Sequence, residues 1–267
     1  MSAGTRRRKI QEYLSGHDRL TVEEAVRVFH ASPATIRRDF SEISADGGVE
    51  RFRGGICRRQ NDKDNMIPFT LRTKWYSAEK RYLAWHVYEY LKDVRSLFID
   101  GGSTTTHLGM FLRNPGQVVI TNSLTLCNVV SEMFPSGGGA EIRLTGGRFY
   151  PESGLFLGSH AEAAAAAYHA EVTVLSARGI TPSGIYNHNE LIAGMNLRMI
   201  ENSDRTVLIA DHSKIGHHAM NKVCSLQKIE ALFTVKTEEN RKYLEEIQAA
   251  GVKVFCDFPF EVGSSPG

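Results

Sequence analysis

The chain has 267 residues, of which 42% are hydrophobic and 23% charged, and its formal net charge is +2. This composition argues against disorder, and the length allows a small domain joined to a larger one. No apolar run approaches the roughly 20 residues that cross a bilayer, and the first residues lack the apolar core of a signal peptide. We therefore expect a cytoplasmic protein without a membrane partner.

The charge is unevenly distributed along the chain. Residues 1–59 hold 12 basic and 8 acidic residues, whereas residues 60–267 hold 20 and 22. A basic head on a weakly acidic body suggests a polyanionic partner for the head. The four cysteines lack the spacing of a zinc site or a disulfide framework, which indicates a reducing compartment. No metal site and no cofactor are predicted.

The first sixty residues predict three helices. The first begins near Thr5, and Thr21 caps the second with Glu24 three residues later, as in a capping box. The third runs from Pro33 to about Ala45, with Ser32 at its N-cap. Its apolar residues share one face, so Thr35, Arg37 and Arg38 project elsewhere near its N-terminal end, where a helix-turn-helix protein contacts the major groove. A short alternating segment between glycine pairs then predicts a hairpin wing that presents Arg51 and Arg53.

The stretch SPATIRRDFSEISADGGVERFRGG resembles the signature of the DeoR family of bacterial transcriptional regulators. Arg53 stands where the family usually has histidine. The resemblance implies a winged helix-turn-helix domain over residues 1–59 that binds double-stranded operator DNA. The resemblance and the predicted wing together give the expected DNA-contacting residues: Ser32, Thr35, Arg37, Arg38, Arg51 and Arg53.

Residues 60–76 are predicted as a linker, because a polar run there ends before Pro68. Beyond an amphipathic helix at about 77–91, strands and helices alternate as far as Phe255, which predicts an α/β domain over residues 77–257 with a mostly parallel sheet. Residues 258–267 remain as a C-terminal tail. The predicted strands are 97–100, 118–121, 141–145, 172–177, 206–210, 231–235 and 252–255.

Glycines and hydroxyl side chains follow three of these strands. Gly101 to Thr106 come after the first, Thr121 to Ser123 end and follow the second, and Gly146 follows the third. Free backbone N–H groups, hydroxyls and a helix N-terminus suit a phosphate, and ligands of open α/β sheets bind at the carboxyl ends of the strands. One such junction is weak evidence for a ligand site, because many junctions of this kind serve only to cap the following helix. Three junctions in succession favour a phosphate-binding site.

The segments FIDGGSTTTHLG, VVITNSL, RLTGG, LFLGSHAE and ADHSKIG resemble the DeoR-family sensor domain, which is similar in fold to ribose-5-phosphate isomerase and the CoA-transferases. The family binds phosphorylated sugars or related metabolites there, and binding commonly weakens DNA affinity. The pocket residues implied are Asp100, Gly102, Ser103, Thr104, Thr105, Thr121, Asn122, Ser123, Gly146 and Lys214. Lys214 supplies positive charge.

Arg178 departs from the family pattern, which usually has an acidic residue at this point of a G-A-D-G-I segment. Arginine does not act as a general base near neutral pH, whereas isomerisation of a sugar phosphate needs a carboxylate. We therefore expect a regulator and no enzyme, with Arg178 adding a second positive group for an anionic effector.

Two alternatives remain open from the sequence. One is an enzyme of the isomerase or CoA-transferase type, and the other is a DNA-binding protein that acts without an effector. The favoured hypothesis is a repressor of carbohydrate-metabolism genes that forms a homodimer or homotetramer, because paired half-sites multiply specificity.

Overall fold

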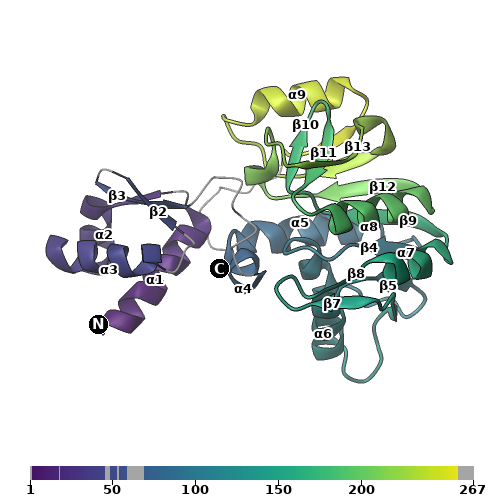
Figure 1. The fold of residues 1–267 in the computed structure, drawn as a ribbon, viewed down its shortest axis with the longest axis horizontal. Helices are drawn as coiled ribbons and strands as arrows, with labels where there is room; N and C mark the ends of the chain where they lie inside the picture. Colours follow the sequence, from purple (N-terminus) through teal and green to yellow (C-terminus); the bar gives the residue numbers. More distant parts are fainter. Residues whose placement is uncertain (1, 18, 46–48, 53, 59–68, 258–267) are drawn as a thin grey trace. The chain divides into compact units, whose positions relative to one another are not determined.

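The computed structural model describes residues 2–17, 19–45, 49–52, 54–58 and 69–257. The chain divides into two compact units, one ending at Ala78 and the other beginning at Glu79 (Figure 1). Each unit has a separate hydrophobic core. Of the helices described, none has the length and hydropathy of a membrane-spanning segment.

The N-terminal unit packs three helices against a small antiparallel sheet. The helices are α1 (Ala3–Gly16), α2 (Val22–Phe29) and α3 (Pro33–Ala45), and all three predicted helices are confirmed. Strands β1 (Arg19–Thr21), β2 (Val49–Phe52) and β3 (Gly55–Arg58) follow the order β1-β3-β2. The β2–β3 hairpin is the predicted wing. Strand β1 was not predicted, because three residues are too short to show an alternating pattern.

The glycine pair at the turn of the wing, between β2 and the start of β3, has a physical reason. Gly54 has φ +105°, which a residue with a side chain rarely adopts. A Cβ on Gly55 would lie 2.4 Å from the carbonyl oxygen of Leu20, because β1 runs directly beside this residue. The glycines therefore permit the wing to turn and to pair with β1.

The segment expected as a linker contains a helix. Residues 60–68 lie outside the described ranges, but α4 (Phe69–Lys74) occupies the second half of the predicted linker. Six residues span fewer than two turns, so the amphipathic pattern was too short to recognise. Helix α5 (Ser77–Tyr90) then begins where the second amphipathic helix was predicted.

The C-terminal unit is built on a seven-stranded parallel sheet of order β15-β14-β12-β9-β4-β5-β6. All seven predicted strands are confirmed within a few residues. Their bounds are β4 (Ser96–Ile99), β5 (Val118–Thr121), β6 (Glu141–Leu144), β9 (Ala170–Leu175), β12 (Ser203–Ile209), β14 (Ala231–Phe233) and β15 (Lys253–Phe255).

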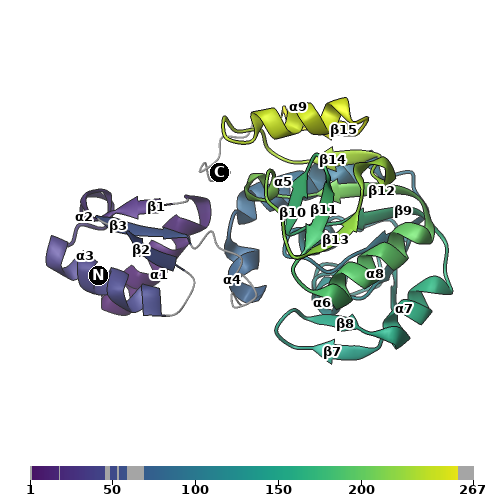
Figure 2. The same ribbon diagram turned by 45° about the horizontal axis from the view of Figure 1, so that its top comes forward.

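Helices cover both faces of this sheet (Figure 2). Side chains of β4 alternate between two cores: Leu97 and Ile99 pack in the core that includes α5, and Phe98 packs in the other. The remaining helices are α6 (Leu124–Met133), α7 (Ser159–Ala166), α8 (Glu190–Glu201) and α9 (Arg241–Ala249). The 3-10 helices in the described part of this unit are η2 (Thr105–Met110), η3 (His212–Lys214) and η4 (Leu226–Lys228).

Two further β structures flank the sheet and were not predicted. One is the hairpin of β7 (Arg148–Tyr150) and β8 (Leu155–Leu157). The other is a three-stranded antiparallel sheet of β10 (Gly179–Thr181), β11 (Gly184–Asn187) and β13 (Asn221–Cys224). These short strands do not alternate with helices as the strands of the main sheet do, and tertiary contacts decide their pairing.

The strand order positions a site. The chain enters the sheet at β4, places β5 and β6 on one side, and then places β9, β12, β14 and β15 on the other. The order therefore reverses between β4 and β9. In open α/β sheets, ligands bind outside the carboxyl ends of the strands at such a switch point.

Candidate DNA-binding and effector-binding sites

The N-terminus of α3 is held by the predicted cap. The Thr35 backbone N–H donates to Ser32 Oγ at 3.3 Å, and the two side-chain oxygens lie 2.8 Å apart. These contacts satisfy donors that the first helical turn leaves free. Both hydroxyls therefore already have a role in forming the helix.

Of three consecutive charged residues in α3, two face the solvent and the third is buried. Arg37 and Arg38 are exposed, and within the described ranges neither guanidinium forms an ion pair. Asp39 is 2% exposed and accepts hydrogen bonds from Arg6 of α1 at 2.5 Å and 3.4 Å. The two arginines are thus available to a polyanion, while Asp39 joins two helices.

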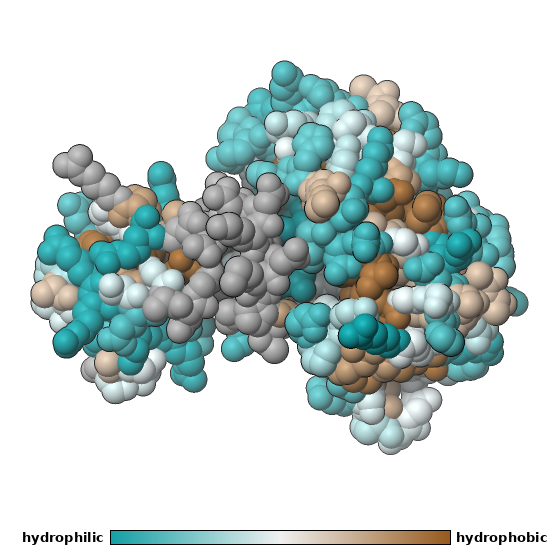
Figure 3. All heavy atoms as spheres, in the orientation of Figure 1, coloured by the Kyte–Doolittle hydropathy of each residue, from teal (hydrophilic) through white to brown (hydrophobic). Residues whose placement is uncertain are grey.

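The wing contributes a further arginine beside α3. Arg51 is exposed, and its Nη1 donates to Ser41 Oγ at 3.1 Å, which brings the β2 side chain next to the helix. Arg53, the other arginine predicted in the wing, lies outside the described residues. On the face drawn in Figure 3, hydrophilic residues gather where α3 runs in Figure 1.

The predicted effector residues lie at the carboxyl ends of adjacent strands. Asp100 follows β4, Asn122 follows β5, Gly146 follows β6, Arg178 follows β9 and Lys214 follows β12. These five strands are neighbours in the sheet, so their carboxyl ends form one polar edge. This edge brings together residues that are more than 100 positions apart in the sequence.

Asp100 is a buried carboxyl at the switch point. It is 3% exposed, and its Oδ1 accepts no hydrogen bond from the described residues. Burial raises its pKa to about 6, although the nearby Asn196 side chain and the backbone N–H groups of Gly101 and Ser176 oppose the rise. A carboxyl in this setting holds a proton more readily than an exposed one.

Several predicted residues use their polar atoms to build the edge itself. Thr121 Oγ1 donates to the Ile99 carbonyl at 2.6 Å, and Asn122 Oδ1 accepts from the Gly101 N–H at 3.2 Å. Ser123 Oγ caps α6 by accepting from the Leu126 N–H at 3.2 Å. These three side chains are fully buried. Their observed contacts hold the loops after β4 and β5 together.

The loop after β4 differs from the prediction. Gly102 N–H donates to Thr105 Oγ1 at 2.7 Å, and Thr104 is buried at the N-cap of η2 without a side-chain capping bond. The helix expected here is the six-residue 3-10 helix η2, so it contributes little macrodipole toward a phosphate.

In the loop after β6, Gly146 has φ +68°, and a Cβ on this residue would meet no atom within 4 Å.

A buried cluster of charges lies beside this loop. Lys80 on α5 donates to Ser103 Oγ at 3.2 Å, and its Nζ lies 3.6 Å from Asp211 Oδ2. The Lys80 and Asp211 side chains are only 3% and 1% exposed. Burial alone would raise the pKa of Asp211, but the positive charges of Lys214 and Lys80 hold it well below its usual range.

A second pair joins the same two segments. Glu79, also on α5, accepts from the His212 backbone N–H at 2.7 Å and lies 2.8 Å from His212 Nδ1. Glu79 and Lys80 thus bind consecutive residues after β12. No group of histidine, cysteine and acidic side chains among the described residues has the arrangement of a metal site.

Glu79, Lys80, Asp211 and His212 were not among the predicted site residues. A signal for the α5 pair existed, because Glu79 and Lys80 precede Leu83 by four and three residues and therefore share its buried face. Asp211 and His212 lie within the segment ADHSKIG, from which only Lys214 was selected.

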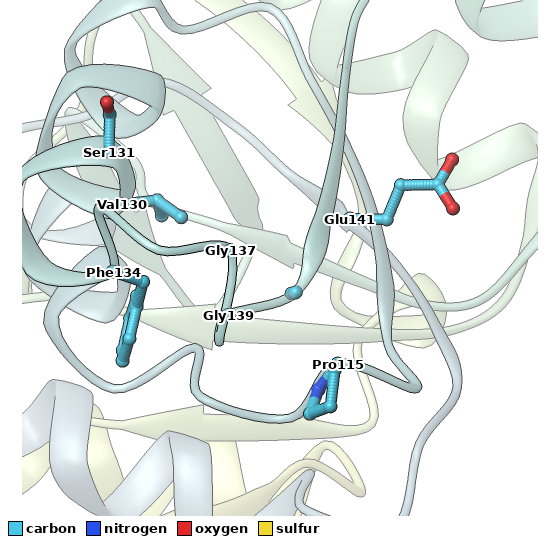
Figure 4. Close-up of a pocket in the computed structure, with 8 residues that line it drawn as sticks. Pro115, Val130, Ser131, Phe134, Gly137, Gly139 and Glu141 are labelled. Atoms are coloured by element: carbon cyan, nitrogen blue, oxygen red, sulfur yellow. The ribbon is translucent and has the colours of Figure 1, made fainter.

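A surface hollow lies elsewhere in the C-terminal unit. It is lined by residues of the α6 C-terminal half, the following loop and the start of β6, including Val130, Phe134 and Glu141 (Figure 4). Glu141 begins β6, so this hollow is at the amino end of the sheet. It is separate from the edge that holds Asp100 and Lys214.

The arrangement defines a class of protein: a winged helix-turn-helix unit with exposed arginines, followed by an α/β unit with a polar strand edge. The family model described as the DeoR C terminal sensor domain matches residues 76–236, and the DeoR-like helix-turn-helix domain matches residues 6–61. This chain belongs to the DeoR family, and it is a DNA-binding transcriptional regulator.

Curated relatives support the same assignment. The HTH-type transcriptional regulator YulB of Bacillus subtilis is 30% identical over 88% of this chain and 89% of its own length. The glycerol-3-phosphate regulon repressor of Escherichia coli K12 is 28% identical over 88% and 91%. The transcriptional repressor GlcR of Bacillus subtilis is 26% identical over 92% and 93%. A solved D-ribose-5-phosphate isomerase matches 52% of this chain and 53% of its own chain, at 13% identity and a TM-score of 0.37.

Proposed function

We propose that this regulator is a repressor of carbohydrate-metabolism genes, and that a phosphorylated sugar or related anionic metabolite controls its binding to operator DNA. The effector binds at the carboxyl ends of β4, β9 and β12. The observation that carries this proposal is the positive charge beside the reversal of strand order: Lys80 donates to Ser103 Oγ after β4, and Lys80 and Lys214 both act on the Asp211 carboxylate after β12.

The proposed pocket has two sides: one carries positive charge for the anionic group of the effector, and the other binds a hydroxyl of the effector. Lys214 and Arg178 supply positive charge for the anionic group. Asp100 supplies an acceptor whose Oδ1 is unpaired among the described residues, which suits a hydroxyl of the effector. Gly102, Ser103, Thr104, Thr105 and Gly146 form the floor, and Thr121, Asn122 and Ser123 fix the floor in place.

The names of relatives agree with a phosphorylated effector. One is a repressor of a glycerol-3-phosphate regulon and another is named as a repressor of an aga operon. The proposed DNA contacts are Thr35, Arg37, Arg38, Arg51 and Arg53, with Ser32 at the helix N-terminus. We propose that two or four copies assemble, so that paired recognition helices read paired half-sites.

We further propose that the chain is a regulator without catalytic activity. Arg178 stands at the carboxyl end of β9, and its guanidinium stays protonated at neutral pH and so abstracts no proton. Asp211 and Glu79, the carboxyls described beside the proposed pocket, already contact Lys80 and His212, so isomerisation would require Asp100 to exchange protons with substrate carbon. Incubation with ribose 5-phosphate should give no ribulose 5-phosphate, and turnover would support the enzyme alternative.

Fluorescence anisotropy tests the proposal. Labelled DNA from upstream of the gene is titrated with protein at about 150 mM salt, where weak nonspecific binding is suppressed, and scrambled DNA of equal length serves as control. A panel of sugar phosphates and their unphosphorylated sugars is then added. We expect release by a phosphorylated compound and none by its parent sugar. Operator binding that no compound changes would contradict effector control.

A further inference from the structure

Strand β6 leaves one side of the main sheet open. It is the last strand in the sheet order, and it pairs with β5. The backbone N–H groups of Glu141 and Thr145 donate to carbonyl oxygens of the β5 segment at 2.9 Å. Because the backbone groups of successive residues alternate in direction, those of Ile142 and Leu144 face away from β5. Within the described ranges no strand pairs with this side, which we call the open side of β6.

The exposed side chains of β6 carry opposite charges two positions apart. Arg143 Nε donates to Glu141 Oε1 at 2.8 Å, and the two side chains are 44% and 57% exposed. If two copies of β6 pair antiparallel about Ile142, Glu141 of each copy lies opposite Arg143 of the other. A pairing centred on Arg143 would instead place two arginines opposite each other, which is unfavourable. The charges therefore favour the register centred on Ile142.

The same register brings an exposed leucine to the hollow beside β6. Ala140 lines this hollow together with Val130 and Phe134, and Figure 4 shows their surroundings. Ile142 packs in the core that contains Val130 and Ala140. Side chains alternate along a strand, so Leu144 lies on the same face of the sheet as Ile142, and it is 40% exposed. In the register about Ile142, Leu144 of the second copy lies opposite Ala140.

The hollow has room for this side chain. Its volume is about 360 Å³. A cavity of about 150 Å³ already accepts a molecule of the size of benzene, which is larger than the side chain of leucine. Symmetry makes the contact occur twice, because each copy offers one leucine and one hollow. Burial of both leucines against apolar walls would stabilise the association.

We propose that the open side of β6 is an interface between two copies of this chain, in which the two strands pair antiparallel about Ile142 and join their sheets. The occupant is a second copy because the charges and the leucine–hollow contact are complementary to themselves, as a two-fold interface requires. This inference rests on the proposed assembly into two or four copies, and it assigns a surface to that assembly.

Charges on edge strands can also prevent pairing, because they make contact with another strand unfavourable. In β6 the two charges have opposite signs and lie at equal distances from Ile142. They therefore disfavour shifted registers and favour the symmetric one. The charge pattern thus selects a particular partner strand, which is β6 itself.

The test measures the mass of the full-length protein by analytical ultracentrifugation over a dilution series. The variants are Glu141→Arg and Arg143→Glu, and both change exposed side chains, so the fold should persist; circular dichroism verifies it. Each substitution turns two attractive cross-strand pairs into repulsive ones. We expect the dissociation constant to rise by about tenfold or more in each variant, and the mass to halve on dilution.

An equal mixture of the two variants separates the interface from a role within one chain. In a mixed pair, the arginines of one copy lie opposite the glutamates of the other, so the mixture should regain the mass of wild type. An ion pair that acts only within each chain predicts no recovery, because neither variant regains the Glu141–Arg143 pair. Failure of the mixture to recover would therefore contradict the proposed register.

The leucine contact has its own matched control. Leu144→Asp should also halve the mass, because it brings a charge to the apolar hollow of the second copy. Leu197 on α8 is 37% exposed, so Leu197→Asp is an equally exposed substitution and should leave the mass unchanged.

The outcomes distinguish this inference from the proposed function. If wild type assembles and the β6 variants keep its mass, the open side of β6 has another occupant and the inference is wrong, while the proposed assembly stands. If wild type is a monomer at every dilution, the proposed assembly and the β6 interface both fail. Release of operator DNA by an effector is measured separately by anisotropy and does not depend on either result.

Discussion

Asp39 accepts two hydrogen bonds from Arg6, so that the acidic residue of the Arg37-Arg38-Asp39 run joins α3 to α1 while the arginines remain exposed. The run therefore combines two roles. Asp39 fixes the orientation of the recognition helix, and the arginines are left to contact DNA.

Replacement of Arg37 or Arg38 by alanine should weaken operator binding and leave effector binding unchanged. A lost base contact costs about 1–3 kcal/mol and relaxes sequence specificity, whereas a lost phosphate contact reduces the salt slope by about one. Anisotropy titrations at several salt concentrations distinguish the two. Arg198→Ala, a surface variant in α8, controls for the loss of one positive charge. Unchanged operator affinity in both α3 variants would refute the recognition helix.

Asp39→Ala should destabilise the N-terminal unit by about 2 kcal/mol or more, because it removes the buried carboxylate that accepts two hydrogen bonds from the mostly buried Arg6 guanidinium. Arg8→Ala is the control. Its ion pair with Glu12 is exposed and contributes about 0.5 kcal/mol or less. Urea unfolding followed by circular dichroism measures both. Equal effects of the two substitutions would show that the Arg6–Asp39 pair does not stabilise the fold.

Asp100→Asn should remove a pH dependence of stability. The pKa of Asp100 is raised from 3.8 to about 6 in the folded protein, so its contribution to stability is fully present below pH 3.8 and is lost as the pH rises through about 6. Wild type should therefore lose stability relative to Asp100→Asn between about pH 4 and 7, by up to about 3 kcal/mol. Urea unfolding at intervals across this range gives the difference. A difference that is constant with pH would contradict the buried carboxyl.

Arg178→Ala should weaken binding of the anionic effector without weakening operator binding. Its backbone N–H pairs with the Tyr186 carbonyl at 2.9 Å, and alanine retains this bond. The expected loss is about 1.5–3 kcal/mol if the guanidinium contacts the anion. Calorimetric titration with the releasing sugar phosphate measures it, and Arg198→Ala on α8 serves as a surface control. Unaltered affinity would remove Arg178 from the proposed pocket.

The sequence predicted the sheet well because its central strands are buried and strongly apolar, with Leu97 to Ile99 as an example. The helix caps at Thr21 and Ser32 were predictable from local chemistry alone. The short strands β7, β8, β10, β11 and β13 were not, since tertiary contacts decide their pairing. The position of Asp100 and Lys214 on one edge follows from strand order, which periodicity does not specify.

The charge cluster was harder to predict for a physical reason. Lys80 and Asp211 are 131 positions apart, and each residue type is normally exposed. Opposite charges make the burial of both residues acceptable, and the helical spacing that places Lys80 on the buried face of α5 does not identify its partner. Thr121, Asn122 and Ser123 show the converse: their types suggested ligand contacts, whereas their observed bonds support neighbouring loops.

The central claim is that one chain couples operator DNA to a phosphorylated effector, and reciprocal titration tests it most directly. Effector affinity is measured with and without operator DNA, and operator affinity with and without effector. Linkage requires both ratios to be equal, and we predict a common factor of about 5–150. Effector affinity that is identical with and without operator DNA would contradict the claim.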